Sequence, residues 1–218
     1  MLSAELIQRH FEAQDYEKLL RDVLSNGLDL PLPLRVRLSQ GPVAAIALGL
    51  RRLAELTYGP TPLGRAMLGE LLERQREDGA FAGGGGWPDT LATATVIAAL
   101  NQIAADHPKM AIESAISARE RALSALAAMQ GDDGLWRCPD DRDHGQRALV
   151  SAFIYSLLAA DESFRATVRL ADLLSWFDER LNRLDQSTRM LYRLGRAAEP
   201  GRSLSKQPNQ PQPIAAAA

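Results

Sequence analysis

Charge-free stretches alternate with amphipathic stretches through the middle of this chain. Residues 43–50, 90–105 and 148–160 contain no Asp, Glu, Lys or Arg, which is typical of helices that are buried on nearly every side. Residues 62–77 and 111–130 instead place apolar residues at helical spacing with charged residues between them. We therefore predict helical hairpins, in which a buried inner helix pairs with an amphipathic outer helix.

The pattern continues towards both ends of the chain. Amphipathic spacing predicts four further helices, over residues 3–13, 16–25, 164–184 and 188–197. Asp161-Glu162-Ser163 stands where the N-cap of the helix over 164–184 is needed. From Glu199 onwards Pro, Gln, Ser and Asn dominate. We expect residues 1–197 to form one helical domain and residues 198–218 to be a disordered tail.

One motif occurs twice at the joints between these hairpins. Gln75-Arg76-Glu77-Asp78-Gly79-Ala80-Phe81 returns as Gln130-Gly131-Asp132-Asp133-Gly134-Leu135-Trp136, and Gly79 and Gly134 are 55 residues apart. Asn26-Gly27 looks like a degenerate third copy. A fixed period indicates one supersecondary unit that is copied and stacked. Because each hairpin has an open apolar edge that a neighbour must cover, we predict an all-α array of three to four antiparallel helical hairpins, curled into a partial ring.

The repeated corner resembles a known motif. A Gln, an Asp-Gly turn and an aromatic residue, followed by an inner helix of small residues, are similar to the repeat of the terpenoid cyclase and protein prenyltransferase superfamily. Both copies look like the Gln-and-Trp motif of squalene and hopene cyclases. The resemblance covers about residues 62–160 and, weakly, 16–60. It implies an α/α toroid in which Gln75 and Gln130 tie a helix end to the next repeat.

The resemblance also suggests a catalytic acid. Class II terpene cyclases carry an Asp-x-Asp-Asp motif at the start of an inner helix, and the matching positions of the second repeat read Asp141-Arg142-Asp143-His144. By this resemblance, Asp143 is the candidate catalytic acid, and Asp141 and His144 are the residues that adjust its acidity. The alternative is that these carboxylates form a solvated loop that caps the following helix.

Two functions remain open at this stage. The resemblance implies a prenyltransferase- or cyclase-like protein that binds an apolar, isoprenoid-like small molecule in the bore of the ring. The candidate ligand-binding residues are Trp87, Asp89, Trp136, Phe153 and Tyr155. An aromatic content of 6% is low for a cavity that steers carbocations. The alternative is a non-catalytic module on a partial toroid, which binds another protein or forms a homodimer through its open apolar edge.

Composition narrows the choice of partners. The formal net charge is -2 and the pI is near 6.0, and the basic residues are scattered, so we expect no nucleic-acid partner. We find no stretch long and apolar enough to span a membrane and no secretion signal at the N-terminus. Cys138 is the single cysteine, which rules out an intrachain disulfide. We expect a cytoplasmic protein.

A metal site is not predicted. Cys138, Asp140, Asp143 and His144 are residue types that bind zinc. The other inner helices start at Pro42 and Thr90, however, and bring no His or Cys to the same end of the array. We therefore expect neither a metal ion nor another cofactor.

Overall fold

The computed structural model describes residues 41–83, 89–137 and 144–200. The helices predicted over 3–13 and 16–25, the third corner at Asn26-Gly27 and nearly all of the predicted tail lie outside these ranges. The described part is helical, which confirms the predicted all-α class.

Eight α-helices and two short 3₁₀ helices make up the described part. They are α4 (Val43–Glu55), α5 (Pro62–Glu73), α6 (Thr90–Asp106), η1 (Pro108–Met110), α7 (Glu113–Ala128), α8 (His144–Leu158), α9 (Glu162–Thr167), α10 (Leu170–Arg180), η2 (Leu181–Arg183) and α11 (Gln186–Ala198). None of these helices combines the length and the apolar composition that a membrane span requires.

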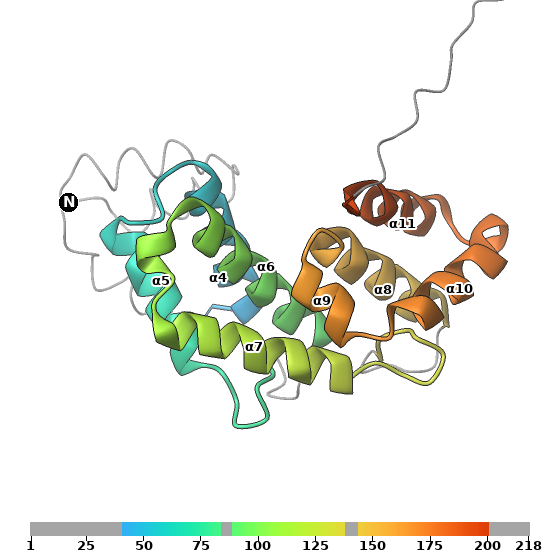
Figure 1. Cartoon of the computed structure of the whole chain (residues 1–218), viewed down its shortest axis with the longest axis horizontal. Helices are drawn as coiled ribbons and strands as arrows, with labels where there is room; N and C mark the ends of the chain where they lie inside the picture. The colour runs from blue at the N-terminus through green and yellow to red at the C-terminus, as the bar shows by residue number, and fades with distance from the viewer. Residues whose placement is uncertain (1–40, 84–88, 138–143, 201–218) are drawn as a thin grey trace, which may run out of the picture.

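The helices pack in two rows. The central row consists of α4, α6, α8 and α11, and each of these helices packs against the next. The flanking row consists of α5, α7 and α9, which also contact one another in order. Figure 1 shows α4 and α5 towards one end of the molecule, α11 at the other, and α7 along one edge. Because α4 packs on α5 and α6 packs on α7, the first glycine corner joins two consecutive hairpins, as predicted. The second corner leads from α7 to α8, which packs mainly on α6 and α11.

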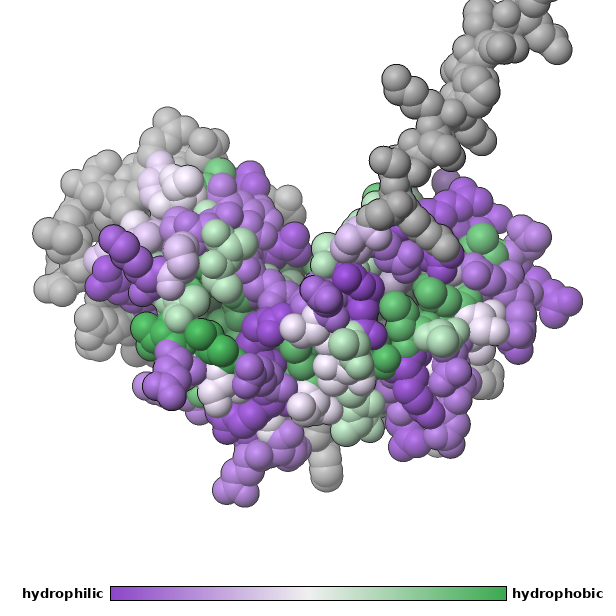
Figure 2. Space-filling view, in the orientation of Figure 1, coloured by the Kyte–Doolittle hydropathy of each residue, from purple (hydrophilic) through white to green (hydrophobic). Residues whose placement is uncertain are grey.

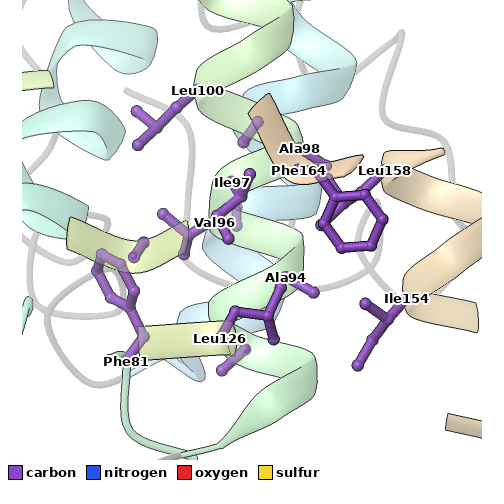
Figure 3. Close-up of a cluster of buried hydrophobic side chains, with 14 of the residues drawn as sticks. Phe81, Ala94, Val96, Ile97, Ala98, Leu100, Leu126, Ile154, Leu158 and Phe164 are labelled. Carbon is purple, nitrogen blue, oxygen red and sulfur yellow. The ribbon is translucent and has the colours of Figure 1, made fainter. Parts of the chain in front are cut away.

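The core is centred on α6. Every residue from Ala92 to Leu100 is buried, which confirms the predicted inner helix over 90–105. Figure 3 shows side chains from α8 and α9, including Ile154 and Phe164, on one side of α6, and Phe81 and Leu126 on another. The many alanines of α6 let three neighbouring helices approach its backbone closely, because a small side chain keeps packed helices near one another.

The other two charge-free helices are less enclosed than predicted. In α4, Ile46, Ala47 and Leu50 are buried, but Leu48 is 47% exposed. In α8, Leu149 is 38% exposed and Phe153 is partly exposed. The reason is position: α6 packs on α4, α7 and α8, whereas among the described helices α4 packs mainly on α5 and α6, and α8 mainly on α6 and α11. Absence of charge therefore did not mean burial on every side.

The single helix predicted over 164–184 is wrong. The chain forms α9 and α10, with extended backbone at Val168. Asp161 caps α9 as predicted, because its side chain accepts hydrogen bonds from the backbone N–H groups of Ser163 and Phe164. The predicted helix over 188–197 is present as α11.

Candidate functional site

The first corner is tied to the next hairpin by one side-chain amide. Gln75 Nε2 donates to the carbonyl of Gly79 at 2.9 Å and to the carbonyl of Ala118 in α7 at 2.7 Å. Gln75 Oε1 accepts from the guanidinium of Arg121, also in α7. One side chain thus closes its own turn and binds the neighbouring helix.

The second corner repeats this arrangement on a different partner. Gln130 Nε2 donates to the carbonyl of Gly134 at 2.6 Å and to that of Arg169 at 3.3 Å. Gln130 Oε1 accepts the backbone N–H of Arg169 at 2.8 Å. Arg169 is the residue at which α9 has ended and α10 begins, so the amide of Gln130 satisfies backbone groups that a continuous helix would have paired internally. This pairing of Gln130 with Arg169 accounts for the break between α9 and α10.

Both turns require glycine. Gly79 has φ 83° and Gly134 has φ 80°, in the left-handed region that L side chains rarely adopt. A Cβ at Gly79 would lie 2.6 Å from the carbonyl oxygen of Arg121, and one at Gly134 would lie 2.5 Å from the backbone N of Leu173. The neighbouring backbone therefore lies so close to each turn that any side chain larger than a hydrogen atom would collide with it.

Two hydroxyl groups anchor the aromatic residues of the motif, and the sequence analysis did not identify them. The backbone N–H of Phe81 donates to Thr93 Oγ1, and that of Trp136 donates to Ser151 Oγ, both at 3.0 Å. Thr93 and Ser151 are fully buried. In the sequence, each of these residues is a hydroxyl residue in an otherwise apolar helix. The second corner is three residues longer than the first, however, so Thr93 and Ser151 do not align at the 55-residue period of the motif.

The predicted ligand-binding residues mostly have structural partners. Asp89 caps α6 by accepting from the N–H groups of Leu91 and Ala92. Trp136 is fully buried, and its indole N–H donates to the carbonyl of Leu126 at 2.8 Å. Phe153 is partly exposed, and Trp87 lies outside the described residues.

Tyr155 belongs to a ring cluster that holds α11. Its hydroxyl donates to Glu199, and its ring lies 5.8 Å from that of Tyr192, centroid to centroid. The hydroxyl of Tyr192 donates to Asp178 at 2.6 Å. Burial, together with these hydrogen bonds to carboxylates, raises the pKa of both tyrosines above the usual range. The rings are thus kept neutral and serve to dock α11 on α8.

The predicted catalytic group cannot be placed. Asp141 and Asp143 lie outside the described residues, and His144 is the first residue of α8. In the described part of the chain, no three His, Cys, Asp or Glu residues come together in a way that could hold a metal ion. The assignment of Asp143, Asp141 and His144 stays a prediction.

A polar network joins α6, α7 and the start of α9. Asp161 Oδ2 accepts from Asn101 Nδ2 and from Arg119, both at 2.7 Å, and Arg119 also donates to Asn101 Oδ1. Burial by itself raises the pKa of Asp161, but the hydrogen bond from Asn101 and the charge of Arg119 together outweigh it and lower this pKa below its ordinary value. The network thus fixes α6, α7 and the start of α9 relative to one another.

The outward face of α11 carries two exposed apolar side chains among polar ones and packs against no other described helix. Thr188, Tyr192 and Gly195 face α8, and a Cβ at Gly195 would lie 2.4 Å from the ring of Tyr155. On the opposite face Met190 is 57% and Leu194 is 54% exposed. Arg189 and Arg193 line the same shallow hollow of about 500 Å³. We call these four residues the α11 face.

These features define the class of protein as an all-α array of stacked helical hairpins joined by Gln and Asp-Gly corners. No family model, curated protein or solved structure matches this chain. The kinship with terpenoid cyclases and prenyltransferases therefore stays a prediction from the corner motif.

Proposed function

We propose that this chain is a non-catalytic interaction module that binds an acidic amphipathic helix of a partner protein on the α11 face. The observation that carries the proposal is the exposure of Met190 and Leu194, at 57% and 54%, at the end of the helical array. Terminal units of repeat proteins normally present a polar outer face, because no further repeat covers them. Two exposed apolar side chains at this end form a surface that a binding partner can cover.

Spacing and charge indicate what that occupant is. Met190 and Leu194 are four residues apart, so they form one ridge along the helix, which suits an amphipathic helix packed alongside. Arg189 and Arg193 flank this ridge, and neither forms an ion pair with another residue that the structure describes. A partner that places carboxylates beside its apolar stripe would neutralise both arginines.

Self-association through the same face is disfavoured. In an antiparallel two-fold pair of α11 helices, the arginine side of one copy would lie next to the arginine side of the other. Like charges placed together across an interface oppose association. The predicted homodimer is therefore an outcome for the experiment to exclude.

A synthetic peptide pair tests the proposal. One peptide forms an amphipathic helix with leucines on one face and glutamates beside them, and its twin carries lysines in place of the glutamates. We expect the acidic peptide alone to bind, with an affinity that falls as salt rises. Met190→Asp and Leu194→Asp should weaken binding about tenfold or more, while Leu48→Asp, at another exposed leucine, should not.

Two results would overturn this proposal. Equal binding of the lysine peptide would show that charge does not select the partner. A stable dimer in sedimentation velocity that Met190→Asp dissociates would assign the face to a second copy of the chain.

A second candidate function rests on the exposed side of α8. Leu149 and Phe153 lie one helical turn apart on the central row, and both keep part of their apolar surface exposed. We propose that an isoprenoid-like apolar molecule binds against them. Incubation with a lipid extract followed by mass spectrometry should detect a retained isoprenoid, which Phe153→Asp should abolish and Met190→Asp should leave unchanged. Retention of none by the unaltered chain would dismiss this candidate.

A further inference from the structure

A groove lies on the flanking row, away from both the corners and the α11 face. It measures about 630 Å³ and runs between α5 and the segment that links α6 to α7. Leu68 and Met110 form its buried floor, and Ile112, at the rim, is 53% exposed. Figure 2 shows a hydrophobic area on the left of the molecule, where α5 lies next to the start of α7 in Figure 1. The volume falls within the usual range for small-molecule sites.

A glycine without a packing reason opens this groove. Gly69 is in the middle of α5 and lines the groove. A Cβ built there meets no described heavy atom within 4 Å, whereas one at Gly49 or Gly195 would lie within 3 Å of a neighbouring side chain. Glycine inside a helix is less stable than alanine. Because nothing in the described protein needs the space over Gly69, the bare backbone indicates close approach by a ligand.

Two cations stand at the edges of the groove. Arg65 comes from α5 and Lys109 from η1, both side chains line the groove, and neither has an ion-pair partner among the described residues. The acidic residue at the rim, Asp106, already accepts a hydrogen bond from Gln102 at 2.6 Å. His107 is held against the carbonyl of Ala54 at 3.2 Å. Asp106 keeps its negative charge, because the amide of Gln102 is neutral. The groove therefore carries two cations against one carboxylate and is positive overall.

We propose that this groove binds an amphiphilic anion, which is a hydrocarbon chain that carries a carboxylate or phosphate group. The hydrocarbon chain lies over Gly69 and against Leu72 and Met110, and the anionic group lies between Arg65 and Lys109. This site is separate from the α11 face, so the two proposals can fail independently.

Three probes with the same hydrocarbon chain test the charge requirement. Dodecyl phosphate, dodecanol and dodecyltrimethylammonium are titrated into the full chain below the concentration at which each forms micelles. We expect dodecyl phosphate to bind with one site per chain, and about tenfold or more tightly than the neutral and cationic probes. The double variant Arg65→Ala, Lys109→Ala should remove this preference, and Arg183→Ala, at an exposed cation in η2, should keep it.

Variants at Gly69 test the position of the hydrocarbon chain. Gly69→Phe fills the groove and should weaken binding of dodecyl phosphate about tenfold or more. Gly69→Ala adds one methyl group where the hydrocarbon chain approaches the backbone, so it should weaken binding to a smaller extent. Circular dichroism of both variants checks that α5 has formed. Unchanged affinity in a folded Gly69→Phe variant, or equal affinity for the cationic probe, would overturn the proposal. Competition by phosphatidylglycerol vesicles would support it with a lipid headgroup as the source of the anion, and binding without such competition would support it with a free amphiphile.

Discussion

At the residue scale, glycines in the corners and the glycine in α5 occupy opposite environments. Gly79 and Gly134 have positive φ, and a neighbouring backbone lies within 2.6 Å of the place a Cβ would take. Gly69 has ordinary helical backbone and open space above it. The same substitution should therefore have opposite effects at the two kinds of position.

We expect Gly134→Ala to lower the free energy of unfolding by about 2 kcal/mol or more, because alanine is strained at positive φ and its Cβ meets the backbone of Leu173. We expect Gly69→Ala to raise it by about 0.5–1 kcal/mol. Urea denaturation of both variants measures the two changes. A loss of stability in Gly69→Ala would mean that the space above α5 is already filled within the protein.

The corner glutamines differ in their surroundings although the motif is the same. Gln130 is buried and contacts two carbonyls and one N–H group. Gln75 is partly exposed, and its oxygen faces the guanidinium of Arg121. Conversion to glutamate removes the donor from each corner, but at Gln75 the new charge meets a cation.

We expect Gln130→Glu to lower the free energy of unfolding by about 2–3 kcal/mol, because a buried carboxylate would face two carbonyl oxygens. Gln75→Glu should lower it by less, since Arg121 pairs with the new carboxylate. Denaturant unfolding of the two variants side by side provides the comparison. Equal losses would argue that burial and the nearby cation do not distinguish the corners.

At the scale of the elements, a few polar side chains decide where helices end and how they meet. The amide of Gln130 holds the break between α9 and α10. Asp161 caps α9 and also receives Arg119 and Asn101 from two other helices. Such groups couple the local end of a helix to its tertiary neighbours.

This coupling predicts a dependence of stability on pH. The pKa of Asp161 in the folded chain lies below its ordinary value of 3.8, so the folded state favours the ionised form. The resulting stabilisation is present above the unfolded pKa and is lost as the pH falls through the folded pKa. Asp161→Asn keeps an N-cap but removes the charge. We expect it to cost about 1–2 kcal/mol at pH 7.

The difference between Asp161→Asn and the unaltered chain should shrink as the pH is lowered below about 4. Thermal or urea unfolding from pH 7 down to pH 2 checks this trend. A difference that stays constant over this range would assign the effect to lost packing or hydrogen bonding and not to the charge.

At the scale of the whole molecule, the stacking of hairpins leaves one end of the described array uncovered. α11 docks on α8 through Gly195, whose backbone lies against the ring of Tyr155. The opposite side of α11 carries the exposed Met190 and Leu194. One helix thus both completes the central row and forms the surface that we propose for a partner.

We expect Gly195→Val to lower the free energy of unfolding by about 1–3 kcal/mol, because the added side chain would push α11 away from Tyr155. Ala197→Val, on the exposed side of the same helix, should change it by only a few tenths of a kcal/mol, about the difference in helix propensity. Urea unfolding of both variants separates these effects. A similar small change in both would show that α11 is not held by close packing on α8.

The sequence by itself determined the helical class, the glycine corners between helices and the burial of α6. These follow from local chemistry. Charge-free stretches and the glycine turns of residues 75–81 and 130–136 recur at a fixed period, which indicates one helical unit that is copied along the chain. The cap at Asp161 was readable for the same reason, because a cap depends on residues within one turn.

Only the tertiary structure decided which apolar side chains remain uncovered. Trp136 and Tyr155 were candidates for ligand contact, yet they are buried with hydrogen-bonded polar atoms. The α11 face and the groove over Gly69 were not identified from the sequence, and the break at Val168 was mistaken for continuous helix. Each depends on which helices lie next to one another. Hydrophobic spacing predicts which face of a helix is buried, but not which helix packs against that face.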